Sequence, residues 1–227
     1  MIVVGLTGGI ATGKSTVTAL LRQYGITVLD CDEVAHAVVR QGRWGYKRVV
    51  KAFGNSVLLT NGDINRDKLG DMVFHVHDAR RRLNSATHLP VALELVRQLA
   101  VEWLSLTSVA VVDMPLLFET GSHKLVWPRV IVTCSHETEV ERLMKRDACS
   151  KPEAEAKVKA QMPLRLKQNK SQIVIDNSGN KHHCEQQVQQ LVRQLQGKYK
   201  WLGFATSPVV FVGMVWLLLR VLRLSSA

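Results

Sequence analysis

Gly8-Gly9-Ile10-Ala11-Thr12-Gly13-Lys14-Ser15 is the segment from which the fold of this chain can be predicted. It matches the phosphate-binding loop pattern, in which a glycine and four further residues precede Gly-Lys-Ser or Gly-Lys-Thr. The apolar run before it, residues 2–6, suits a buried strand, and apolar residues follow at helical spacing as far as Tyr24. Strand, glycine turn and helix together predict an anion site, because backbone N–H groups of the turn and of the first helical turn are free to face a phosphate.

The residues of this segment have predicted roles in nucleotide binding. Lys14 is expected to reach the β- and γ-phosphates, and the Ser15 hydroxyl to bind Mg²⁺. An ordinary glycine-rich turn is the alternative, and the filled pattern and its flanks argue against it. The predicted ATP-binding residues here are Gly8, Gly9, Ile10, Ala11, Thr12, Gly13, Lys14, Ser15 and Thr16.

Length and charge set limits on the rest of the chain. Its 227 residues allow one α/β domain with a sizeable core. The net charge of +11 suggests anionic partners such as nucleotides, nucleic acid or membrane head groups, or simply a lysine-rich soluble surface. Nucleic-acid binding would rest on charge alone, since basic and aromatic residues are not interleaved. We therefore expect no nucleic-acid partner.

The four cysteines form no Cys-x-x-Cys pair, so neither a zinc ribbon nor a redox motif is predicted. A reducing, intracellular setting is the simpler interpretation. Because the phosphate loop begins at Gly8, we expect no signal or transit peptide before the first strand.

Short apolar runs separated by helical segments predict the fold class. They argue for an α/β, P-loop kinase fold with a five-stranded parallel sheet and helices on both faces. Ligands should bind at the carboxyl ends of the strands, where Asp32 and Asp113 fall. The predicted strands are residues 2–6, 26–30, 109–113, 130–133 and 173–176.

A kinase that acts on a hydroxyl needs a carboxylate near the acceptor. Asp32, just after the second predicted strand, is the best candidate for the base, and with Ser15 it is assigned to the predicted Mg²⁺ site. Asp30 is a second option for the base. Asp32 could also serve as the N-cap of a helix that begins at Glu33.

Positive charge must offset the charge that spreads over the transferred phosphoryl group. Arg142 and Arg146 lie four residues apart and so share one helical face. The basic segment 145–170, with a break at Pro163, is what a closing lid would look like. A solvated basic hairpin is the alternative.

Several blocks beyond the loop resemble the dephospho-coenzyme A kinase family. Asp113-Met114-Pro115-Leu116-Leu117-Phe118-Glu119 is far more specific than the phosphate loop, and the resemblance extends from residue 2 to 196. The hydrophobic tail resembles the eukaryotic, kinase-domain-containing branch of this family. The other similar blocks are residues 7–15, 28–32, 62–66, 83–84 with His88, 142–146, 161–163 with Lys167, and 176–179.

The resemblance implies an activity and a site. ATP with Mg²⁺ would phosphorylate the ribose 3′-hydroxyl of dephospho-coenzyme A, the last step of coenzyme A synthesis, in a monomeric enzyme. A nucleotide core, a helical substrate region at about 60–105 and a lid at about 145–170 would make up a domain of residues 1–200, and Asn177 would lie near the adenine of ATP. The implied substrate-binding residues are Thr7, Asp32, Arg66, Asn84, His88, Pro115, Leu116, Leu117 and Glu119.

Two departures from the family pattern are present. Leu89 separates His88 from Pro90, which is expected to shift by one residue the start of a long helix predicted from Thr87 onward. Ser171-Gln172 replaces the usual Ala-Asp before the fifth strand, and we have no physical interpretation of that change.

The carboxyl-terminal tail has a different composition. Residues 202–219 contain no charged side chain, and the length is marginal for a bilayer, which needs roughly 17–25 residues. We predict that residues 201–224 form a transmembrane anchor, on the outer mitochondrial membrane or the endoplasmic reticulum, with the catalytic domain facing the cytosol. A buried core helix is the alternative.

Two other functions stay open at this point. A different small-metabolite kinase, for a nucleoside or nucleotide, would use the same loop and acid. A membrane-tethered nucleotide-binding protein without turnover is supported only by the altered region around His88. Guanine recognition is disfavoured, because Asn169-Lys170-Ser171-Gln172 lacks the final acid of the Asn-Lys-x-Asp pattern.

Overall fold

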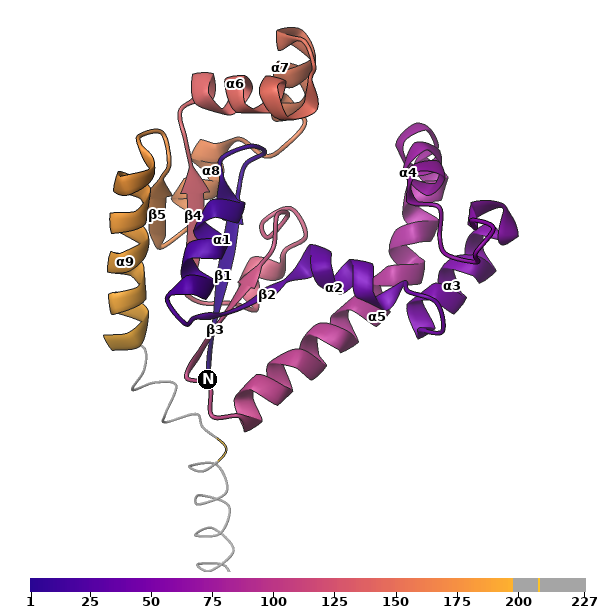
Figure 1. The fold of residues 1–227 in the computed structure, drawn as a ribbon, viewed down its shortest axis with the longest axis horizontal. Helices are drawn as coiled ribbons and strands as arrows, with labels where there is room; N and C mark the ends of the chain where they lie inside the picture. The colour runs from indigo at the N-terminus through magenta and orange to yellow at the C-terminus, as the bar shows by residue number, and fades with distance from the viewer. Residues whose placement is uncertain (198–207, 209–227) are drawn as a thin grey trace, which may run out of the picture. The chain divides into compact units, whose positions relative to one another are not determined.

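The computed structural model describes residues 1–197 and Pro208, and Figure 1 shows their fold. They belong to two compact units, one of residues 1–28 with those from Glu102 onward, the other of Leu29–Val101. The predicted anchor, residues 201–224, lies outside the described residues except for Pro208. In the described part of the chain, no helix combines the length and the apolar character that a bilayer span requires.

The sheet has five strands in the order β2-β3-β1-β4-β5, and all of them except the last two residues of β2 belong to the first unit. Strand β1 pairs in parallel with β3 and with β4, and β4 pairs in parallel with β5. The five apolar runs are thus confirmed as strands. Their bounds are β1 (Ile2–Gly8), β2 (Thr27–Asp30), β3 (Val109–Asp113), β4 (Arg129–Thr133) and β5 (Ile173–Asp176).

The register brings the carboxyl ends of the central strands to one edge. Leu6 of β1 lies opposite Asp113 of β3, and Thr133 of β4 lies opposite Asp176 of β5. The loop that follows Gly8 therefore emerges beside the acid that ends β3. This is the edge at which parallel sheets bind ligands.

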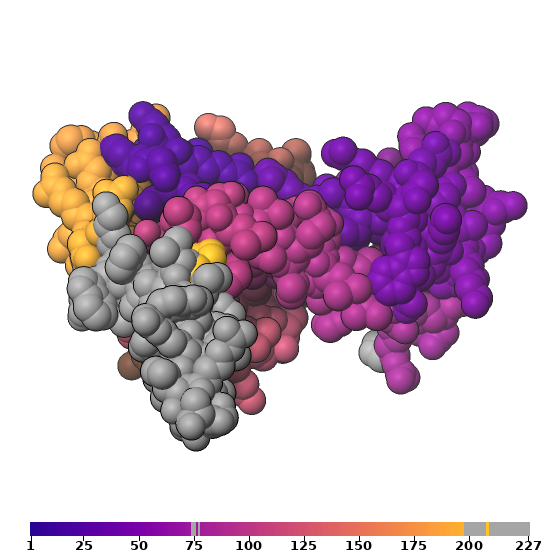
Figure 2. Space-filling model, turned by 90° about the horizontal axis from the view of Figure 1, so that it is seen from below, coloured from indigo at the N-terminus to yellow at the C-terminus, as the bar shows by residue number. Residues whose placement is uncertain are grey.

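Alternation along β1 divides the core of this unit between two faces, because successive strand side chains point to opposite sides. Val4 and Leu6 pack with α1 (Lys14–Gln23) and α9 (Lys181–Gly197), which lie side by side in Figures 1 and 2. Val3 packs on the other face, against a cluster of Leu117, Phe118 and Val126. Helix α8 (Leu164–Asn169) and the turn η2 (Ser122–Lys124) belong to the same unit.

Helices α6 (His136–Asp147) and α7 (Lys151–Lys159) pack on each other beyond β4. The Ser135 side chain caps α6 by accepting the N–H of Thr138 at 3.2 Å, and Ser150 forms a capping box with Glu153 before α7.

The second unit is helical. Its elements are α2 (Cys31–Val38), α3 (Trp44–Phe53), the turn η1 (Asn55–Val57), α4 (Arg66–His75) and most of α5 (His77–Leu104). Its core is apolar, with Val49 and Val57 fully buried.

The predicted start of the long helix near Thr87 is wrong, because α5 begins at His77 and continues through Pro90. A proline inside a helix has no N–H, so the carbonyl four residues earlier, on Ala86, loses its helical donor. Arg48 supplies a replacement: its Nε donates to Ala86 O at 2.9 Å and its Nη2 to Ser85 O at 2.8 Å. Leu89 therefore changes no helix start and is half-exposed in the middle of α5.

Candidate active site

The phosphate loop links β1 to α1 at the carboxyl edge of the sheet. Gly13 is the residue before α1 and has a φ of +85°, the left-handed region that glycine adopts without strain. A Cβ at this position would lie 2.1 Å from Asn177 Nδ2. Glycine is therefore required at position 13 both for the turn and for the close approach of Asn177.

A buried acid lies next to the loop lysine. Asp113 ends β3 with 1 % exposure, and its two carboxylate oxygens accept from the Lys14 ammonium and, at 2.8 Å, from Thr18 Oγ1. The ion pair holds Lys14 at the start of α1. Ser15, the next residue, is exposed in the first helical turn.

These residues fit a magnesium ion that is held mainly by phosphate oxygens. Among residues 1–197 and Pro208, no group of three or more His, Cys, Asp or Glu side chains could hold a metal by itself. Mg²⁺ usually keeps several waters and takes one or two protein oxygens beside substrate phosphates. The exposed Ser15 hydroxyl offers such an oxygen.

Two predicted residues hold the end of the loop. The Thr12 carbonyl accepts from Asn177 Nδ2 at 2.8 Å and from Arg142 Nη1 at 3.4 Å, while Arg142 Nη2 donates to Asn177 O at 3.0 Å. Arg142, Asn177 and the loop are thus brought together. Arg146 is not part of this group: its half-exposed side chain donates from Nε to Asp147 Oδ1 at 2.8 Å.

The beginning of the loop is held by other residues. The N–H of Ile10 donates to Gln161 Oε1 at 3.1 Å. A Cβ on Gly9 would lie 2.5 Å from Glu139 Oε1 and 2.8 Å from Leu164 Cδ2, so both side chains pack closely on the loop. Glu139 is buried, and burial raises the pKa of its carboxyl group above the usual range.

The segment after β3 returns along the sheet edge. Thr7 Oγ1 donates to the Pro115 carbonyl at 3.1 Å, so the fully buried Thr7 fixes this segment. Leu117 is fully buried, whereas Leu116 is half-exposed. Glu119 Oε1 lies 2.7 Å from the buried Lys167 Nζ.

Comparison with known proteins agrees with this arrangement. The sequence pattern described as dephospho-CoA kinase matches residues 2–183. The chain belongs to the dephospho-CoA kinase family. The resemblance seen in the sequence is thereby confirmed.

Relatives from distant organisms match most of the chain. A dephospho-CoA kinase of Arabidopsis thaliana is 42 % identical over 204 residues, covering 90 % of this chain and 88 % of the relative. One of Geobacillus kaustophilus is 40 % identical over 191 residues, covering 84 % and 95 %. A dephospho-CoA kinase domain-containing protein of Danio rerio is 40 % identical over 203 residues, with 89 % of each chain covered.

Solved structures support the fold. TT1252 of Thermus thermophilus has a TM-score of 0.73 and 30 % identity, covering 86 % of this chain and 98 % of its own. The dephospho-CoA kinase of Campylobacter jejuni has a TM-score of 0.65 at 23 % identity, covering 85 % and 96 %, which shows the shared fold alone.

The second unit of this dephospho-CoA kinase family member carries the remaining predicted residues. Asp32, Arg66, Asn84 and His88 are all exposed. Asn84 and His88 lie four residues apart on α5 and so share a face of that helix. That these residues meet the nucleotide loop stays a prediction.

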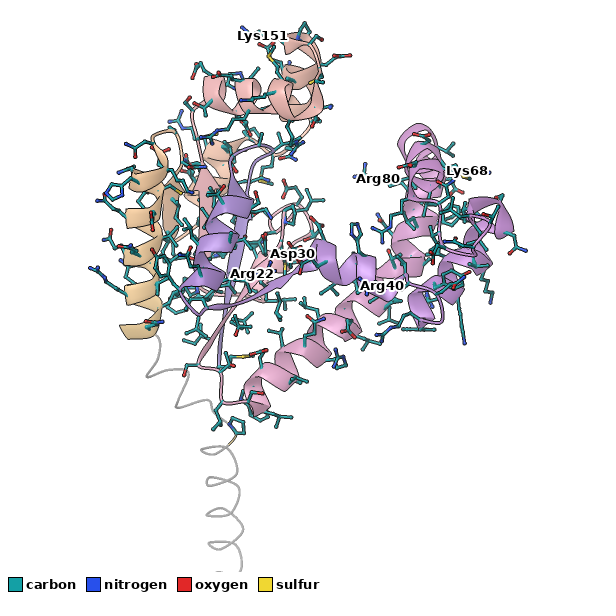
Figure 3. All side chains as sticks on the ribbon, viewed as in Figure 1. Arg22, Asp30, Arg40, Lys68, Arg80 and Lys151 are labelled. Atoms are coloured by element: carbon teal, nitrogen blue, oxygen red, sulfur yellow. The ribbon has the colours of Figure 1, made fainter. Side chains whose placement is uncertain are left out.

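Asp30, not Asp32, caps α2. Its Oδ1 accepts the backbone N–H groups of Asp32 at 2.8 Å and Glu33 at 3.2 Å, and Figure 3 shows Asp30 where β2 gives way to α2. The alternative role considered for Asp32, as an N-cap, is therefore taken by its neighbour. The Asp32 carboxylate is left exposed at the first turn of the helix.

Sequence reasoning placed Asp113 at the ligand-binding edge without a specific role, and it gave no site role to Gln161, Glu139 or Lys167. An acidic residue at the end of an apolar run was a visible signal for Asp113, since loop lysines need a partner at that edge. Gln161 and Lys167 lie in blocks that resemble the family, but nothing in their spacing indicated which residue they contact. Their contacts span more than 40 positions along the chain and become visible only in the fold.

Proposed function

We propose that this protein transfers the γ-phosphoryl group of ATP to the ribose 3′-hydroxyl of dephospho-coenzyme A, giving coenzyme A and ADP. Membership of the dephospho-CoA kinase family supports the choice of acceptor. The observation that carries the proposal is the phosphate loop held at its end by Asn177 and Arg142 and at its beginning by Gln161, beside the block 113–119. A loop held this way has its N–H groups in place before the nucleotide arrives.

Each residue is given one role in the reaction. Asp32 accepts the proton of the 3′-hydroxyl as its oxygen attacks the γ-phosphorus and the bond to the β-phosphate oxygen breaks. Lys14 and the loop N–H groups neutralise charge on the β- and γ-phosphates, and Arg146, free of the loop, is delivered to the transferred phosphoryl group. Mg²⁺, bound through Ser15, supplies further charge neutralisation when present.

The acceptor is tested with the full-length protein, ATP and MgCl₂ and a panel of dephospho-coenzyme A, adenosine, AMP and shikimate. We expect turnover with dephospho-coenzyme A and a product that co-elutes with coenzyme A and shows a 3′-phosphate by phosphorus NMR. Faster turnover of another acceptor would assign the protein to a different metabolite kinase. ATP binding without transfer to any acceptor would favour a nucleotide-binding protein that lacks turnover.

We also propose that residues 201–224 anchor the protein in an organelle membrane with the kinase domain in the cytosol. The support is the uncharged run 202–219, which is flanked by Lys198 and Lys200 before it and by Arg220 and Arg223 after it. Deletion of residues 201–227 should move the protein from the membrane to the soluble fraction of cells. The control variant keeps the tail at full length but places two arginines within the uncharged run, Phe211→Arg with Leu218→Arg. An unchanged membrane fraction after the deletion rules the anchor out.

A further inference from the structure

Lys167 is the largest fully buried side chain among the described residues, with an exposed fraction of 0 %. Its Nζ lies 2.7 Å from Glu119 Oε1. This distance defines an ion pair. The geometry is not that of a hydrogen bond, and within the described part of the chain Nζ has no hydrogen-bond acceptor. The two charges are therefore close, but the N–H groups of the Lys167 ammonium make no hydrogen bond to the described residues.

Stability alone is a weak reason for such a group. Removing an ammonium from water costs several kcal/mol, roughly, and apolar residues of similar size often do as well as a buried ion pair. A second carboxyl group is close by: the charge of Lys167 opposes the burial effect that raises the pKa of Glu139. Lys167 thus carries its charge among carboxylates of two different elements.

The pair connects two segments that matter for the reaction. Glu119 ends the block 113–119, whose Pro115 carbonyl is fixed by Thr7. Lys167 lies on α8, one helical turn after Leu164, which contacts Gly9 of the loop. The residues just before α8 are also attached, because Gln161 accepts from the loop and Met162 packs on the cluster around Leu117.

We propose that Lys167 is a positioning residue: through its ion pair it holds the Glu119 carboxylate, and with it the segment 115–119, at a fixed place relative to the phosphate loop so that the acceptor alcohol is aligned. This inference rests on the proposed function, in which Glu119 lines the dephospho-coenzyme A site. Lys167 acts on the substrate through Glu119 and not by direct contact.

The test compares Lys167→Met, Glu119→Gln and the double variant in the full-length protein, with Lys170→Met as a matched exposed lysine on the same segment. KM and kcat are measured for ATP and for dephospho-coenzyme A separately, well below the melting temperature. Lys167→Met should lower kcat/KM for dephospho-coenzyme A by on the order of 10²-fold, the size of effect that a misplaced contact produces, with KM for ATP within about twofold. Lys170→Met should change neither value.

The double variant separates positioning from stability. Lys167→Met removes the partner of Glu119, whose side chain is 24 % exposed and can be hydrated, and the double variant removes both charges, so the two variants should melt within a few degrees of each other. The kcat/KM of the double variant for dephospho-coenzyme A should stay at the level of Glu119→Gln, since the two residues act as one unit. If Lys167→Met does not fold, the test is the comparison of the double variant with Glu119→Gln.

Three results overturn the inference while the wild type remains active. One is near-normal acceptor kcat/KM in Lys167→Met or in the double variant. Another is a loss confined to KM for ATP. The third is an additive loss in the double variant, which would mean that Lys167 acts independently of Glu119. A wild-type protein without activity toward dephospho-coenzyme A overturns the proposed function instead, and the inference with it.

Discussion

The two compact units differ in where they keep their polar side chains. Among the described residues, every buried polar or charged side chain belongs to the first unit, and most of them surround the phosphate loop. The second unit has an apolar core, and its candidate residues Asp32, Arg66, Asn84 and His88 are exposed. The buried set of the first unit is Thr7, Thr12, Thr18, Asp113, Thr133, Glu139, Lys167 and Asn177.

This contrast indicates that the two units contribute to the site in different ways. The polar side chains of the first unit are buried and fixed before any ligand binds. Burial removes their hydration, and this cost is offset only by the hydrogen bonds and ion pairs that they make with one another. The candidate residues of the second unit remain hydrated, because their side chains are exposed. Changes at the buried polar residues of the first unit should therefore alter stability and activity together, whereas changes at the exposed candidate residues of the second unit should alter activity with little effect on stability.

The largest effect is expected at the loop lysine. Lys14→Met removes the charge that meets the β- and γ-phosphates, so kcat/KM should fall by on the order of 10³-fold or more. It also removes the ammonium that pairs with the buried Asp113, so the melting temperature should fall. Lys47→Met, at an exposed position of α3, is the control. Unchanged stability in Lys14→Met would contradict the coupling proposed for the first unit.

The base in the second unit should show the opposite behaviour. Asp32→Asn should lower kcat by about 10²–10⁴-fold, the usual contribution of a positioned base, while ATP binding persists. The melting temperature should not change, because Asp30 provides the helix cap. Asp30→Asn keeps a capping side chain and should keep turnover. A wild-type kcat in Asp32→Asn would exclude Asp32 as the base. A large loss of kcat in Asp30→Asn alone would assign that role to Asp30.

The two arginines of α6 provide a narrower comparison within the first unit. Arg142→Met removes the donors to the Thr12 and Asn177 carbonyls, so KM for ATP should rise about tenfold and the melting temperature should fall. Arg146→Met loses only a contact with Asp147, so its stability should change little while kcat falls by on the order of 10²-fold. Equal effects of the two substitutions on KM for ATP would contradict the bracing role of Arg142.

Local patterns carried most of the fold prediction. The apolar strands and the glycine loop are short-range features, and both are present. The start of α5 could not be predicted, because Pro90 normally ends a helix. The side chain that compensates for it, Arg48, comes from another helix.

The site was predictable to a similar extent. The loop residues have a strong pattern, Arg142 has a helical spacing with Arg146, and Asn177 was implied by the family resemblance alone; the structure brings the loop, Arg142 and Asn177 together. The ion pair of the buried Lys167 with the partly exposed Glu119 joins positions that no local period connects. Lys167 looks like an ordinary surface lysine in sequence, because burial of its charge is decided by the fold.

The smallest effect is expected at Glu139, and its sign follows from burial. Desolvation raises the pKa of this carboxyl group above its ordinary value of 4.5, against the opposing charges of His136 and Lys167. The folded state therefore binds the proton more tightly than the unfolded state, so Glu139 favours folding below pH 4.5 and loses this contribution as pH rises through the folded pKa. Glu155, Lys159 and Cys134 also line the cavity of about 460 Å³ beside it.

Glu139→Gln should consequently melt at the same temperature as the wild type at acidic pH and a few degrees higher at neutral pH, by no more than about 4 °C. The measurement is a series of thermal melts of the two proteins across that pH range. Glu141→Gln, an exposed glutamate on the same helix, should show no pH-dependent difference. A lower melting temperature for Glu139→Gln at neutral pH would mean that the Glu139 carboxylate is stabilised by Lys167 more than burial disfavours it. The buried groups around the loop would then form one ionic cluster, and the ion pair with Glu119 would be only part of it.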